Sequence, residues 1–150
     1  MAFEAFSLKG KTALVTGASS GLGRHFARVL ARAGARVVAA ARRLDRLEAL
    51  TNEIRADGGE AIAVGLDVTK PEKIAAAFDT AQSAFGPVKI LVNNAGVPSN
   101  TFFTQLTEED WRHVMDVNLD GVFRVGQEAA RRMIKAGGGG SIINVSSVLG

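Results

Sequence analysis

Short apolar runs alternate along the chain with segments in which apolar side chains recur every three or four residues. The apolar runs are 13–15, 36–41, 61–64, 88–92 and 142–145. The helical spacing is carried by Leu22, Phe26, Val29, Leu30 and Ala33, by Leu44, Leu47, Leu50 and Ile54, and by Ile74, Phe78, Ala81 and Phe85. Continuous apolar runs are typical of strands buried on both faces, so the alternation indicates a parallel sheet with helices on both sides. Right-handed crossovers make this α/β fold a doubly wound, Rossmann-type sheet.

Capping residues indicate where two of the helices begin. Thr69, with Glu72 three residues later, predicts an N-cap with a capping box, and Pro71 is tolerated in the first turn. Thr107 and Asp110 predict a second capping box at the start of a long helical segment. The expected inner stripe of that segment is Trp111, Val114, Met115, Val122 and Phe123.

A glycine-rich turn, Thr16-Gly17-Ala18-Ser19-Ser20-Gly21-Leu22-Gly23, joins the first apolar run to the first helix. The N-terminus of a helix offers unpaired N–H groups and about half a positive charge, so this arrangement suits a phosphate. Gly17 can turn at positive φ, Gly21 lets the backbone approach a pyrophosphate, and Gly23 lets the helix lie close to the strand. The spacing G-x-x-x-G-x-G differs from the general dinucleotide fingerprint. A P-loop is excluded because no Lys-Ser/Thr follows.

Composition narrows the class of protein. A chain of 150 residues that is 47% hydrophobic can form one domain, 1–150, with a substantial core. The absence of cysteine and the presence of only His25 and His113 argue against a metal site. The N-terminus has no basic region and no apolar run is long enough for a span, so we expect a cytoplasmic protein with no membrane partner. The net charge of +3 is dispersed over several helices without interleaved aromatic residues, which argues against a nucleic-acid partner.

The ends of the second and third runs carry distinctive side chains, and ligands of doubly wound sheets bind at such strand ends. Arg42-Arg43 stands where a carboxylate would favour NAD. Since a guanidinium binds a 2′-phosphate through forked hydrogen bonds, the sequence favours NADP(H) over NAD(H). The alternative is that both arginines are solvated at a helix start. Asp67 could accept a hydrogen bond from an adenine amino group, with Val68 against the ring, or could be an ordinary turn acid beside Thr69.

Amides and a serine occupy the later strand ends. Asn93-Asn94 directly follows the fourth run and can tie neighbouring loops together, and Ala95-Gly96 leaves room for a flat ligand. Asn118 is expected on the buried face of the long helical segment, where it either fastens a helix kink or serves the site. Ser147 follows the fifth run. Without a G-x-S-x-G elbow, it is better suited to donate to a substrate oxygen than to attack as a nucleophile.

These segments in combination resemble the classical short-chain dehydrogenase/reductase family over nearly the whole chain. The resemblance rests on the glycine-rich turn, Asp67, Asn93–Gly96, Asn118 and Ser147. It implies an NAD(P)-dependent ketone reductase or alcohol dehydrogenase, in which Ser147 polarises the carbonyl and Asn118 supports a lysine through water. It also implies a small carbonyl or alcohol substrate and a homo-oligomer, either a dimer or a tetramer. The residues expected to bind the cofactor, with NADP(H) preferred and NAD(H) possible, are Gly17, Ser19, Ser20, Gly21, Leu22, Gly23, Arg42, Asp67, Val68, Asn94, Ala95 and Gly96.

The family's Tyr-x-x-x-Lys motif is missing, because the sequence contains no tyrosine and ends at Gly150. The motif's four-residue spacing puts both side chains on one helix face, and a phenol of pKa about 10 needs the lysine to work near neutral pH. We therefore expect the N-terminal portion of a longer enzyme, inactive as 150 residues alone. The alternative is a non-catalytic dinucleotide-binding or regulatory protein of the same fold. A Rossmann-like methyltransferase would not explain Asn93–Gly96.

Overall fold

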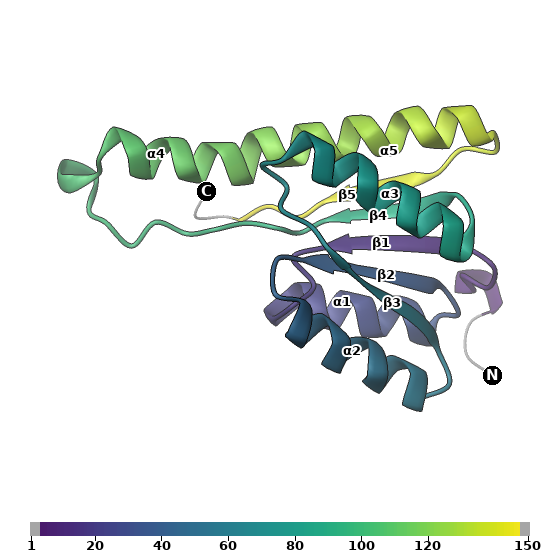
Figure 1. Cartoon of the computed structure of the whole chain (residues 1–150). Helices are drawn as coiled ribbons and strands as arrows, with labels where there is room; N and C mark the ends of the chain where they lie inside the picture. Colours follow the sequence, from purple (N-terminus) through teal and green to yellow (C-terminus); the bar gives the residue numbers. More distant parts are fainter. Residues whose placement is uncertain (1–3, 148–150) are drawn as a thin grey trace.

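The computed structural model describes residues 4–147 as a parallel sheet between two layers of helices (Figure 1). The strands are β1 (Thr12–Thr16), β2 (Arg36–Ala41), β3 (Glu60–Gly65), β4 (Val88–Asn93) and β5 (Ser141–Asn144). They lie in the order β3-β2-β1-β4-β5, and all neighbouring pairs are parallel. The α-helices are α1 (Gly21–Arg32), α2 (Leu44–Ala56), α3 (Pro71–Phe85), α4 (Glu108–Met115) and α5 (Val122–Ala136). Short 3-10 helices lie at η1 (Glu4–Phe6) and η2 (Phe103–Gln105), and η3 (Asp116–Gly121) is a π-helix.

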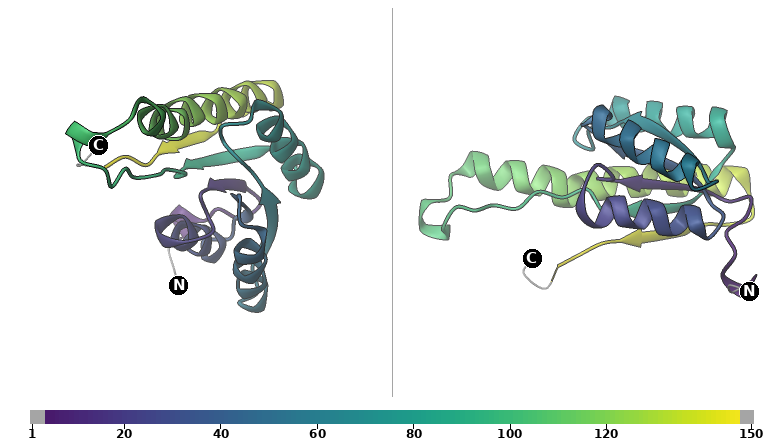
Figure 2. Two further views of the ribbon diagram at one scale, coloured as in Figure 1. Left: turned by 60° about the vertical axis from the view of Figure 1, so that its left-hand side comes forward. Right: turned by 90° about the horizontal axis from the view of Figure 1, so that it is seen from below.

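Helices cover both faces of the sheet, which confirms the doubly wound fold (Figures 1 and 2). Helices α1 and α2 lie on one face, and α3 and α5 lie on the other. Consecutive residues of β1 belong to different core clusters, since Leu14 packs with Phe78 and Leu91, whereas Val15 packs with Leu47. All of these side chains are buried, as the continuous apolar runs predicted. Within residues 4–147, no helix has both the length and the apolar character needed to cross a membrane.

Strand β5 departs from the prediction that every apolar run is buried on both faces. Its residues are all exposed, and Ile142 and Ile143, whose side chains point to opposite faces, have exposed fractions of 39% and 49%. β5 pairs only with β4 and forms an edge of the sheet in the described part of the chain. A strand with one neighbour and little cover on its faces leaves its side chains exposed, whatever its apolar content.

The expected inner stripe of the long helical segment is wrong for Trp111 and Phe123, which are 53% and 63% exposed. Val114, Met115 and Val122 are half-buried, and the buried positions are Val117, Gly121, Val125, Ala129 and Met133. Helix α4 projects beyond the end of the sheet, so its side chains have little to pack against (Figure 1). The π-helical segment between α4 and α5 also changes the residue spacing, so one helical period cannot describe both helices.

The two predicted capping boxes have opposite outcomes. Thr107 accepts from the backbone N–H of Asp110, whose carboxylate accepts from the backbone and hydroxyl of Thr107, as predicted. The box at Thr69 is wrong, because α3 begins at Pro71 with Lys70 as its N-cap. The ring of a proline disfavours helical geometry in the preceding residue, so Lys70 cannot be the first helical residue that a Thr69 cap would require.

Candidate cofactor site

The glycine-rich turn between β1 and α1 has the geometry that its glycines predicted. Gly17 has φ of 65°, and a Cβ there would lie 2.9 Å from the Cα of Ala95. A Cβ on Gly23 would collide with the carbonyl oxygen of Gly17 and with the side-chain amide of Asn94. Gly21 has φ of 54° and open space where its side chain would be. The turn therefore packs closely against the β4 end at Gly17 and Gly23, whereas the space beside Gly21 is open.

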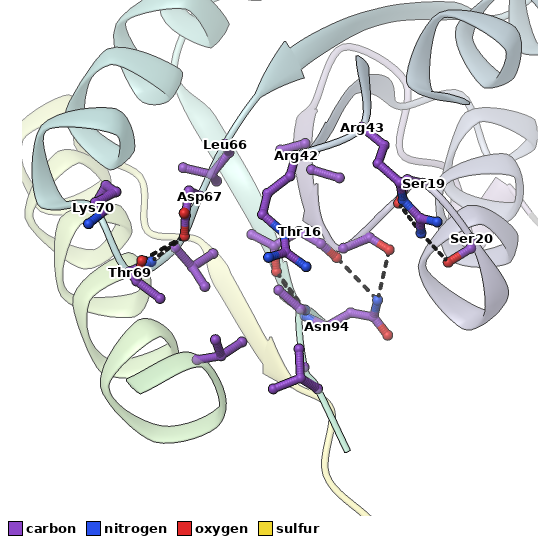
Figure 3. A pocket seen from close by; sticks show the side chains of 18 of the residues that line it. Thr16, Ser19, Ser20, Arg42, Arg43, Leu66, Asp67, Thr69, Lys70 and Asn94 are labelled. Carbon is purple, nitrogen blue, oxygen red and sulfur yellow. Dashed lines mark hydrogen bonds between the residues drawn. The ribbon is translucent and has the colours of Figure 1, made fainter. Parts of the chain in front are cut away.

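A cavity of about 590 Å³ lies at the carboxyl ends of strands β1 to β4 (Figure 3). It spans the switch point between β1 and β4, where the sheet order reverses and doubly wound folds bind ligands. The expected cofactor residues that line it are Gly17, Ser19, Ser20, Leu22, Arg42, Asp67, Val68, Asn94, Ala95 and Gly96. The expected residues outside its lining are Gly21, Gly23, Asn118 and Ser147. Lining residues that our cofactor set omitted are Thr16, Ala40, Ala41, Arg43, Leu66, Thr69, Lys70, Val97, His113, Asp116 and Val117.

Thr16 and Asn94 tie the first and fourth strand ends together. The Thr16 hydroxyl accepts from the backbone N–H groups of Asn94 and Ala95, both at 3.0 Å. The Asn94 side chain donates to the carbonyl oxygens of Thr16 at 3.1 Å and Gly17 at 3.4 Å. This confirms that the amides tie neighbouring loops. The importance of Thr16 was missed, although a hydroxyl that directly follows three buried apolar residues needs a hydrogen-bond partner and so gives a signal.

Asp67 forms the turn that follows β3. Its Oδ1 accepts from the backbone N–H of Thr69 at 3.0 Å and from the Thr69 hydroxyl at 2.8 Å. Burial disfavours the charged carboxylate, but the bonds from Thr69 and the charges of Arg42 and Lys70 outweigh it and lower the pKa of Asp67. The carboxylate is therefore an anion at neutral pH. It serves the turn and lines the cavity at once (Figure 3), so the two sequence interpretations are compatible.

The consecutive arginines after β2 have different surroundings. Arg42 is exposed and lines the cavity beside Asp67. Arg43 donates from Nη2 to the hydroxyl oxygens of Ser19 at 3.0 Å and Ser20 at 3.1 Å (Figure 3). The alternative that both arginines are simply solvated is therefore wrong for Arg43. The sequence indicated a cation at this strand end but not which of the two would reach the glycine-rich turn.

Asn118 and Ser147 do not line the cavity in the described residues. Asn118 lies in the π-helical segment, where its Oδ1 accepts from the N–H of Val97 at 2.8 Å and its Nδ2 donates to the Val97 carbonyl at 2.9 Å. It is exposed, so its expected burial is wrong, because the π-helical segment turns this position outward. The amide nevertheless fastens the segment to the loop after β4. Ser147 follows β5 and is exposed.

Comparison with known proteins places this chain in a family. Residues 11–150 match the short chain dehydrogenase family. A short-chain type dehydrogenase/reductase of Picea abies is 42% identical over 95% of this chain and 55% of its own length. A 3-oxoacyl acyl-carrier-protein reductase of Vibrio cholerae is 41% identical over 96% of this chain and 57% of its own. The crystal structure of a short-chain type dehydrogenase/reductase from Mycobacterium marinum matches with a TM-score of 0.92 and 40% identity, over 95% of this chain and 57% of that one.

The chain belongs to the short chain dehydrogenase family. It spans a little over half the length of these relatives.

Proposed function

We propose that the protein is an NAD(P)-dependent oxidoreductase that transfers hydride between a nicotinamide and the carbonyl or hydroxyl group of a small substrate. The observation that carries this proposal is the cavity at the β1–β4 switch point, with the glycine-rich turn and the N-terminus of α1 on its wall. Residues 1–150 would form its dinucleotide-binding part. The names of the relatives, which include reductases and dehydrogenases, support an enzyme over a non-catalytic binder.

The residues present fit a dinucleotide. Ser20 and Leu22 line the cavity at the N-terminus of α1, where a pyrophosphate would meet the helix. Asp67 and Val68 would take the adenine ring, and Asn94 to Gly96 would line the nicotinamide side. The bound dinucleotide would supply the hydride. Ser147 would hold the substrate oxygen by donating a hydrogen bond, and a tyrosine and a lysine beyond residue 150 would complete proton transfer.

We propose NADP(H) as the preferred cofactor. Arg42 is exposed at the cavity, and its guanidinium can pair with a 2′-phosphate in a way that an NAD-selective carboxylate would oppose. The charge of Asp67 acts on Arg42 only through space, so the guanidinium donors of Arg42 stay available for a phosphate.

A homo-oligomer is our proposal for the assembly. Several large apolar side chains on the long helical segment are exposed, namely Trp111, Leu119, Phe123 and Ile134. Exposed apolar surface of this kind is common at protein interfaces. Light scattering of the purified protein would give a dimer or tetramer mass if the proposal holds and a monomer mass if it does not. The cytoplasmic location that the sequence indicated stays a prediction.

The hydride-transfer proposal is tested by kinetics on the whole protein with NADPH and a panel of small ketones. We expect oxidation of NADPH that depends on the ketone, and a fall in kcat/KM of at least about a hundredfold in Ser147→Ala, because the carbonyl loses its hydrogen-bond donor in the transition state. Ser141→Ala, at the start of β5, the strand that Ser147 follows, is the matched control. Unchanged kcat/KM in Ser147→Ala would contradict the role of Ser147, and absence of any NADPH oxidation would contradict the enzyme.

A further inference from the structure

Arg43 breaks a local rule of helix capping. It is the N-cap residue of α2, a position that favours Ser, Thr, Asp or Asn, and its side chain does not cap that helix. The guanidinium instead reaches the neighbouring turn, where Nη2 donates to the hydroxyls of Ser19 and Ser20 (Figure 3). Ser20 is in turn the N-cap residue of α1 and makes no side-chain capping bond either. The Arg43 guanidinium has no acceptor with which to cap α2, and the Ser20 hydroxyl accepts from Arg43 without capping α1, so a side-chain contact joins the two helix starts.

We propose that Arg43 is a positioning residue that presents the Ser19 and Ser20 hydroxyls to a dinucleotide phosphate, a role that rests on the dinucleotide function proposed above. A hydroxyl has one proton and two lone pairs. When a guanidinium N–H occupies a lone pair, electrostatic repulsion turns the hydroxyl proton away from the cation. Because both serines line the cavity, their protons are then available to an anion within it.

The same contact strengthens the serines as donors and holds the turn. A hydroxyl that accepts from a cation is polarised and donates more strongly. The charge of Arg43 also adds to the positive end of α1, next to which an anion is favoured. Since Arg43 follows β2 and the serines follow β1, the bonds join two walls of the cavity before any ligand arrives. Arg42 makes no hydrogen bond with the residues that the structure describes, and its guanidinium stays free for a separate contact.

This role predicts a different specificity from that of a direct 2′-phosphate ligand. Arg43→Ala should lower the affinity for ADP and for adenosine 2′,5′-bisphosphate by the same factor, about tenfold. Both probes carry the 5′-phosphate that would meet the serines. A direct 2′-phosphate ligand would weaken the bisphosphate alone. Isothermal titration of the purified protein with each probe separates the two. Arg46→Ala, an exposed arginine on the same helix, is the matched control and should bind both probes like the parent.

A double-mutant cycle tests whether Arg43 acts through the serines. In a protein that carries both Ser19→Ala and Ser20→Ala, adding Arg43→Ala should lower the affinity for either probe by less than a further twofold. The hydroxyls that Arg43 positions are already absent from that protein. Arg43→Lys, which keeps the charge and a donor, should recover part of the affinity. A full tenfold loss in the serine-free background, or a loss confined to the bisphosphate, would overturn the positioning role. A parent protein that binds neither probe would instead overturn the dinucleotide function.

Discussion

Gly23 shows how a single absent side chain shapes the site. The residue lies where α1 meets the carbonyl of Gly17 and the amide of Asn94, and both groups belong to the hydrogen-bonded link between the β1 and β4 ends. A methyl group there must displace the backbone of Gly17 as well as the hydrogen-bonded side chain of Asn94. The geometry of the turn and the packing of α1 therefore depend on each other, because the same groups of Gly17 and Asn94 take part in both.

Gly23→Ala is expected to destabilise the protein by about 1–3 kcal/mol, the usual cost of forcing an extra carbon into a packed site. Urea denaturation measures the loss. Gly65→Ala is the control, because its Cβ would meet only Leu44 side-chain atoms at ordinary contact distances of 3.7 Å or more. Equal stability of the two variants would contradict the close approach of α1 to the strand ends.

Arg42→Asp is expected to reverse cofactor preference. The carboxylate would repel a 2′-phosphate and accept from a ribose 2′-hydroxyl, so affinity for NADPH should fall at least about tenfold, or 1.4 kcal/mol, relative to NADH. Fluorescence titration with both nucleotides gives the ratio, and the preference should weaken with salt. The Arg42 assignment fails if the ratio of the two affinities is the same in parent and variant.

The carboxyl of Asp67 gives a pH prediction. Because its folded-state pKa lies below the ordinary value of 3.8, ionised Asp67 stabilises the fold above that value, and this stabilisation is lost as pH falls through the lowered pKa. Asp67→Asn should therefore be less stable than the parent at pH 7, by under about 1 kcal/mol for a partly exposed group. The difference in stability between parent and variant should disappear well below pH 3.8. A gap that widens on acidification in thermal melts would contradict the sign.

At the scale of elements, the sequence predicted the strands and most helices because each has an uninterrupted period. The prediction from sequence failed where a second structural effect changed the pattern within one segment. Thr69 looked like a cap, but the proline at position 71 prevents Lys70 from being helical. The stripe from Trp111 to Phe123 assumed one helical period across a π-helical segment that nothing in the apolar pattern reveals. The bonds from Arg43 to Ser19 and Ser20 were not foreseen, because these partners are 24 and 23 residues away in the sequence.

The capping box at the start of α4 is the element whose contribution is easiest to isolate. Thr107→Ala removes the acceptor for the Asp110 N–H and should lower the free energy of unfolding by about 1 kcal/mol. It also removes the hydroxyl bond from Thr107 that is the largest cause of the lowered pKa of Asp110, while the bond from the backbone N–H of residue 107 remains. Thr104→Ala, in the neighbouring 3-10 helix, is the control. Chemical denaturation with no difference between the two variants would show that the box adds no stability.

At the scale of the molecule, the sheet divides into a covered part and an open edge. Strands β1, β2 and β4 are buried within two helical layers, and the cavity lies over their carboxyl ends. β5 is exposed, and this chain spans a little over half the length of its relatives. The expected residues that line the cavity could be predicted because they follow strands that this chain itself buries. The positions of Asn118 and Ser147 could not, because periodicity carries no information about the π-helical segment or about an exposed edge.

The central claim is that the cavity at the β1–β4 switch point binds NADPH. Hydrogen exchange of the protein, measured with and without saturating NADPH, tests both the binding and its place. We predict slower exchange in the turn from Gly17 to Leu22, after β3 at Asp67 and after β4 at Ala95, with little change at the outer end of α2. Unchanged exchange at all three strand ends, or protection confined to another surface, would contradict the account.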